Sequence, residues 1–267
     1  MADRMTDLKL KTERARKHIT EFLKASEVFF KEHPYTVSAK RDANTREVIY
    51  YVSSSTPVPA AIRLIAGDAI QNLRSALDHL VWQLVDKHSG SGGNATEFPV
   101  CADLKDFTNR APRKIRGVSQ AVFNKIAAFE PYQNAKGHEL WVLHNLNRID
   151  KHRLLVAVGT AHRYMNVGKL MDGKIEQFFG RKSPGLPPLL GLIRDDRNAG
   201  TPVFPLETGT TLFVDSPESE INDKMEFLYE ISFLESGIVE GRSIIDAMEA
   251  MASAVQTVIK TFELDLS

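Results

Sequence analysis

Cysteine is nearly absent from this chain of 267 residues, in which Cys101 is the single one. An internal disulfide is therefore excluded, which fits a reducing compartment. Nowhere does an uncharged run approach the roughly 18 to 20 residues of a membrane span, and the charged N-terminal segment has no apolar stretch typical of a secretory signal. We therefore expect a soluble, cytoplasmic protein without a membrane partner.

Several familiar catalytic and cofactor motifs are missing as well. The chain contains no Gly-x-Gly-x-x-Gly segment, no Gly-x4-Gly-Lys loop and no Gly-x-Ser-x-Gly elbow. The common nucleotide-binding loops and the serine hydrolase motif are thus excluded, and we expect no cofactor.

A net excess of either charge is also absent, because 34 basic residues balance 34 acidic ones. From residue 201 onward, however, 13 acidic residues stand against three basic ones, so this part carries −10 and residues 1–200 carry +10. Such an asymmetry favours a polyanionic partner for the basic part. The alternative is that the acidic and basic regions neutralise each other within the fold.

The apolar residues that are present follow two periods. Helical spacing predicts helices over residues 3–32, 67–84, 103–111, 119–129, 139–155 and 239–262. Alternation predicts a hairpin of residues 35–39 and 48–52, and later strands within residues 164–170, 211–214 and 225–233. Residues 89–94 and 183–202 have the composition of loops. The sequence thus predicts an α+β fold, with a helical bundle core and an antiparallel β-sheet formed by the early hairpin and the late strands.

The same pattern suggests how the chain is divided. Residues 1–155 would form a helical domain with an inserted β-hairpin, and residues 156–238 a β-rich subdomain. Residues 239–267 would form a C-terminal helix that packs on the helical core.

Two of the predicted helices carry ionisable groups among their apolar residues. Helix 67–84 has four polar residues within about 40° of one line, namely Asp68, Asn72, Ser75 and His79. Helix 139–155 is apolar around its whole circumference, yet it carries His144, Arg148, Asp150 and His152. Ionisable groups on a buried helix have to be paired, hydrogen-bonded or functional, because desolvating them unpaired costs several kcal/mol. We therefore look for function on these two helices.

Arg74 and His79 form an Arg-x4-His arrangement within the segment NLRSALDH. This arrangement resembles the signature of the HEPN family, helical-bundle proteins of which many are metal-independent ribonucleases of toxin and defence systems. The resemblance implies that His79 acts as general acid/base on the ribose 2′-hydroxyl or the leaving oxygen, that Arg74 holds the scissile phosphate, and that the protein is a homodimer. The chemistry suits both residue types, since an imidazole titrates near neutral pH and a guanidinium matches phosphate oxygens.

The leading hypothesis is therefore a HEPN-like ribonuclease or RNA-binding protein. Its candidate catalytic residues are Arg74 and His79. Its candidate substrate-binding residues are Asn72, Asp78, Arg148, Lys151, His152 and Arg153.

Two other interpretations stay open. A metal-dependent enzyme would use ligands between the two helices, namely Asp68, His79, His144 and His152. A non-enzymatic binding or scaffold protein would use the same polar groups only as structural networks. Arg74 and Asp78, which are four residues apart, suit an ordinary helix-surface ion pair.

The remaining conspicuous residues are assigned to packing or to solvent. Trp82, Trp141 and Cys101 are interpreted as core residues. The basic segment from Arg110 to Arg116 is interpreted as a solvated loop.

Overall fold

The computed structural model describes residues 4–90, 93, 95–163, 165–166, 192–193, 202–222, 225 and 227–266. The chain folds into two compact units, the first made of Met1–Val28, Val58–Ala157 and Phe233–Ser267, the second of Phe29–Pro57 and Val158–Ser232. The fold is α+β, as predicted. The finer division at residues 155 and 239 stays a prediction. No helix in the described parts of the chain is long and apolar enough to cross a membrane.

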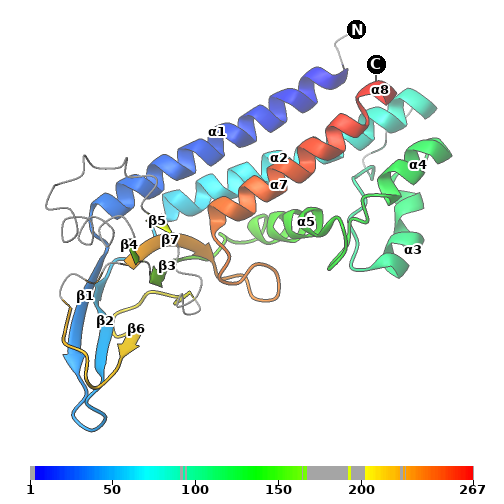
Figure 1. The fold of residues 1–267 in the computed structure, drawn as a ribbon. Helices are drawn as coiled ribbons and strands as arrows, with labels where there is room; N and C mark the ends of the chain where they lie inside the picture. Colours follow the sequence, from blue (N-terminus) through cyan, green and yellow to red (C-terminus); the bar gives the residue numbers. More distant parts are fainter. Residues whose placement is uncertain are drawn as a thin grey trace, which may run out of the picture. The chain divides into compact units, whose positions relative to one another are not determined.

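The first unit is helical, and the last residues of its first helix are assigned to the second unit. Its helices are α1 (Arg4–Lys31), α2 (Ala60–Ser89), α3 (Leu104–Lys114), α4 (Gln120–Ala127), α5 (His138–Asp150), α7 (Ile244–Thr261) and α8 (Glu263–Leu266). Helix α2 packs against both α5 and α7, and α5 also packs against α7 (Figure 1). These three helices therefore enclose the core of this unit.

Helical periodicity explains why these segments pack. On α2 the side chains of Leu73, Leu77, Leu80 and Leu84 recur every three or four residues, and all are at most 1% exposed. Each such side chain contributes about 1.5–3 kcal/mol when it leaves water. The face of α2 that they form is thus the main apolar contact of the bundle.

Several helix boundaries differ from the predicted ones. Helix α2 spans Ala60–Ser89, so it extends beyond the stretch 67–84 on both sides and ends where the loop 89–94 is predicted to begin. Gly90 follows it in a left-handed conformation (φ 68°), which suits a residue without a side chain. Helix α3 continues through Pro112 and ends at Lys114 instead of residue 111. Helix α5 stops at Asp150, so the positions after it lie in a turn instead of on the helix.

The second unit contains the strands. Strands β1 (Tyr35–Arg41), β2 (Val48–Ser55) and β6 (Thr211–Asp215) form an antiparallel sheet in the order β1-β2-β6, which confirms that the early hairpin pairs with a late strand. Strand β7 (Phe227–Phe233) does not join this sheet. It pairs with β3 (Ala157–Arg163), a strand that the pattern did not predict. Strand β4 (Met165–Asn166) pairs with β5 (Leu192–Ile193).

Parts of three predicted segments lie outside the described residues. They are most of the extended run 164–170, most of the loop 183–202 and half of the loop 89–94.

Candidate anion-binding pocket

Arg74 does not face solvent. Its side chain is buried on α2, with 3% of the residue exposed. Its Nη2 group pairs with Asp78 Oδ1 at 2.8 Å and donates a hydrogen bond to the backbone oxygen of Phe98 at 3.0 Å. Asp78 Oδ1 in turn accepts a hydrogen bond from the backbone N–H of Phe98 at 2.9 Å. Arg74 and Asp78 thus bind both backbone polar groups of Phe98 and fix the segment that follows α2.

This ion pair extends to α3 through Glu97. The Nζ atom of Lys114 lies 2.7 Å from Glu97 Oε1, and Arg74 Nη2 lies 3.7 Å from Glu97 Oε2. Burial alone would raise the pKa of Glu97, but the hydrogen bond and charge of Lys114, together with Arg74, hold it below its usual value. A carboxylate is therefore kept ionised between two cations, and it links α2 to α3.

His144 on α5 lies beside this network with a polar atom unused. Its Nδ1 atom is buried without a hydrogen-bond partner in the structure, and so is Nη1 of Arg74. Burial, and after it the charges of Arg74, Lys114 and Arg148, lower the pKa of His144 to about 4, against the opposing effect of Glu97. The imidazole is consequently neutral at pH 7. The three cationic side chains affect its pKa more than the carboxylate of Glu97 does.

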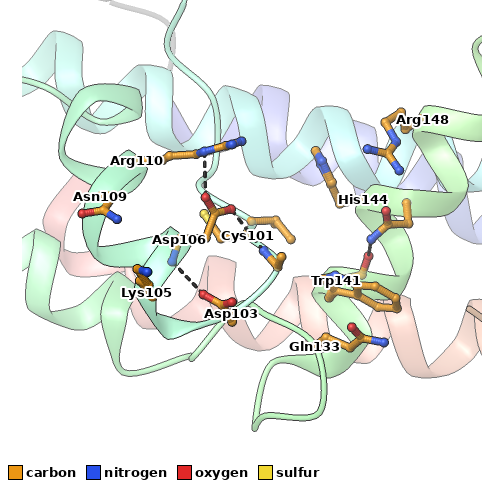
Figure 2. A pocket seen from close by; sticks show the side chains of 13 residues that line it. Cys101, Asp103, Lys105, Asp106, Asn109, Arg110, Gln133, Trp141, His144 and Arg148 are labelled. Carbon is orange, nitrogen blue, oxygen red and sulfur yellow. Dashed lines mark hydrogen bonds and ion pairs between the residues drawn. The ribbon is translucent and has the colours of Figure 1, made fainter.

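A cavity of about 580 Å³ opens in front of His144, between α3 and α5. We call it the α3–α5 pocket. It is lined by Val100, Cys101, Ala102, Asp103, Lys105, Asp106, Asn109, Arg110, Gln133, Trp141, His144, Asn145 and Arg148. In Figure 2 the His144 ring is seen between the guanidinium groups of Arg110 and Arg148. The volume of the α3–α5 pocket lies within the range of small-molecule sites, about 300–1,000 Å³.

Both carboxylates of the pocket have partners. Asp103 caps the N-terminus of α3 by accepting a hydrogen bond from the Asp106 N–H at 2.7 Å. Asp106 pairs with Nε of Arg110 at 2.7 Å. Arg148 is exposed, and the structure gives its guanidinium no hydrogen bond or ion pair with any described residue. The pocket thus holds three cationic side chains against two acidic ones, and Arg148 is available to a ligand.

His79 is placed differently from Arg74. It is exposed on α2, whereas Arg74 is enclosed, because five residues turn a helix by about 140°. The two candidate catalytic side chains therefore do not converge within the chain. Asn72, one of the candidate substrate-binding residues, donates a side-chain hydrogen bond to the backbone oxygen of Asp68 in the same helix, at 2.8 Å.

The residues after α5 also separate. Lys151, His152 and Arg153 are exposed in the turn, so His152 does not continue the helical row of His144 and Arg148. Arg153 forms a two-pronged ion pair with Glu235, with N–O distances of 2.7 and 3.1 Å. The guanidinium of Arg153 is therefore occupied by Glu235 and does not line a substrate groove.

The proposed metal ligands are not brought together. Among the residues that the structure describes, which include Asp68, His79, His144 and His152, no three His, Cys, Asp or Glu side chains are grouped as a metal site. The physical reason is that His144 faces the α3–α5 pocket, whereas Asp68, His79 and His152 are exposed to solvent.

Asp150 occupies yet another place, against the backbone of α2 at Gly67. Burial, and then the charge of Asp68, raise its pKa.

Sequence reasoning names His144 and Arg148 as candidate site residues but does not place Trp141 beside them. Trp141, His144 and Arg148 lie at positions i, i+3 and i+7 of α5, so one helix face could have grouped them. The pattern instead assigns Trp141 to the core, and the structure places it half-buried in the pocket wall. Nothing in the sequence around Glu97 and Lys114 indicates that they belong to the site, because their ion-pair partners lie on other elements.

Comparison with protein-family models, curated proteins and solved structures finds no match to this chain.

Proposed function

We propose that this protein binds RNA and holds one backbone phosphate in the α3–α5 pocket. The observation that carries the proposal is the exposed guanidinium of Arg148, which has no partner among the described residues and lies beside His144 in the pocket. A guanidinium matches phosphate oxygens, and a bound anion would offset the cationic charges that, after burial, lower the pKa of His144. Part of the +10 excess on residues 1–200 is paired with the acidic remainder, as in Lys125–Asp265 and Arg153–Glu235, but Arg148 has no such partner among the described residues.

The test is the binding of a fluorescent single-stranded RNA oligonucleotide at low salt in the presence of EDTA. We expect Arg148→Gln to weaken binding by about five- to tenfold, since the loss of one charge-assisted contact costs about 1 kcal/mol. Arg14→Gln is the matched control, because Arg14 is an exposed arginine on α1. Equal losses in the two variants, or no binding by the wild-type protein, would overturn the proposal.

A second candidate function is metal-independent cleavage of the bound RNA, which the HEPN resemblance implies. The observation that favours it is the neutral imidazole of His144 next to the proposed phosphate site. His144 would accept the proton of the ribose 2′-hydroxyl while that oxygen bonds to phosphorus, and the 5′-oxygen would leave and take a proton from water. A phosphate bound beside the imidazole raises its basicity toward the level that this step needs.

Two histidine variants separate this mechanism from the one that the resemblance implies. If His144 is the base, His144→Gln lowers the cleavage rate in EDTA by a factor of about 100 or more, and His79→Gln leaves it nearly unchanged. A loss of cleavage in His79→Gln but not in His144→Gln would instead assign catalysis to His79, which is exposed on α2.

A further inference from the structure

We infer that the α3–α5 pocket accepts a whole nucleotide, with its base stacked on the indole of Trp141 and its phosphate at His144 and Arg148. This inference rests on the proposed RNA binding and names the unit that the site recognises. It starts from the position of Trp141, which is half-buried and lines the cavity instead of filling the core.

The indole is held in a fixed orientation. The imidazole of His138 stacks on it, with ring centroids 5.5 Å apart and an interplanar angle of 18°. His138 is itself anchored, because its Nδ1 lies 3.2 Å from the backbone N–H of Asn134. A pre-positioned aromatic ring in a pocket wall is what base stacking requires, and stacking accepts every base because each has a π-face.

The spacing along α5 suits one nucleotide. Trp141, His144 and Arg148 share one helix face, and a rise of 1.5 Å per residue places them over about 10 Å. Figure 2 shows Trp141 in the lower part of the pocket and the His144 and Arg148 side chains in the upper part. The aromatic and cationic ends are thus separated as base and phosphate are in a nucleoside monophosphate.

Polar groups for the base edge are also present. The amide side chains of Gln133 and Asn109 line the same cavity and are exposed. Neither amide forms a hydrogen bond with the described part of the chain, so both are available to a ligand of the pocket.

The experiment uses the fact that the chain has two tryptophans. In Trp82→Phe, which changes an exposed position on α2, Trp141 is the sole indole reporter. We expect AMP to quench the emission of this variant, and ribose 5-phosphate, which lacks the base, to bind without quenching it. Calorimetry should find AMP bound about tenfold more tightly than ribose 5-phosphate, and Trp141→Leu should remove this preference while leaving the affinity for ribose 5-phosphate unchanged.

The outcomes distinguish the two proposals. Equal affinities for AMP and ribose 5-phosphate without quenching would overturn the base subsite and leave the phosphate site standing. RNA binding that depends on Arg148 but not on Trp141 would likewise remove only the base subsite. If the wild-type protein binds neither RNA nor the two small phosphates, the proposed function fails and the nucleotide subsite fails with it. Retention of the AMP preference in Trp141→Phe, but not in Trp141→Leu, would identify stacking as its source.

Discussion

At the scale of single residues, the same side-chain types have opposite environments. Arg74 is enclosed and bound to Asp78 and Phe98, whereas Arg148 is exposed and unpaired among the described residues. Breaking a buried ion pair by removing one partner costs about 3–5 kcal/mol of folding stability. We therefore assign Arg74 a structural role instead of a role in ligand binding. Arg148 is therefore the better candidate for a ligand contact.

The lowered pKa of His144 predicts a stability effect. Its pKa of about 4 in the folded protein lies below the ordinary value of 6.5, so the unfolded chain binds more protons between these pH values. The contribution of the neutral imidazole is complete above pH 6.5 and is lost as the pH falls toward 4. Urea unfolding at pH 7 and pH 4.5 should therefore show an acid destabilisation that is roughly 2 kcal/mol smaller in His144→Gln than in the wild type. Parallel losses in both proteins would contradict the buried, neutral state of His144.

At the scale of elements, α2 and α5 approach each other closely at Gly67. A Cβ atom at this position would lie 2.5 Å from Oδ1 and 2.8 Å from Cγ of Asp150. The absence of a side chain at Gly67 is thus what lets the carboxylate of Asp150 rest on the α2 backbone. This contact sets how near the C-terminal end of α5 comes to α2.

The contact at Gly67 predicts that the effect of Gly67→Ala on stability has opposite signs in the wild-type protein and in the Asp150→Ala variant. Gly67→Ala should destabilise the wild-type protein by about 1 kcal/mol, because the carboxylate of Asp150 has to move. In an Asp150→Ala background the same change should stabilise by up to about 1 kcal/mol, since alanine favours the helix. Thermal unfolding of the four proteins of this double-mutant cycle measures the coupling. An identical effect of Gly67→Ala in both backgrounds would show that the two residues do not touch.

At the scale of the whole molecule, the first 200 residues and the remaining 67 carry opposite net charge. Residues 1–200 carry a net +10 and the remainder a net −10, but the fold brings some of these charges together, as in the ion pairs Lys125–Asp265 and Arg153–Glu235. The homodimer implied by the HEPN resemblance stays a prediction, which sedimentation of the purified protein tests.

RNA binding should depend on salt. A plot of log K against log salt concentration should fall linearly, with a slope of about −0.7 for each phosphate of single-stranded RNA that is neutralised. Arg148→Gln should make this slope shallower by about 0.7, because one phosphate contact is lost. Binding that is insensitive to salt, or a slope unchanged by Arg148→Gln, would argue against a phosphate at this residue.

Features that depend on near neighbours in the chain follow from the amino-acid order alone. Helical and alternating patterns predict the α+β class, the long helices and the hairpin, and the i, i+4 spacing suggests the ion pair between Arg74 and Asp78. Helix ends are less predictable. The pattern places His152 on a helix face that in fact stops at Asp150, because nothing local fixes the point at which tertiary contacts replace helical ones.

Which polar groups meet depends instead on tertiary packing. Glu97, Lys114 and His144 lie on three different segments, and their approach to Arg74 depends on how α2, α3 and α5 pack. Periodicity indicates that a side chain points inward, but the partner that it finds there belongs to another element. For this reason Arg74 and His79, close together in the motif, are separated by burial, whereas Arg74 and His144, 70 positions apart, share one electrostatic environment.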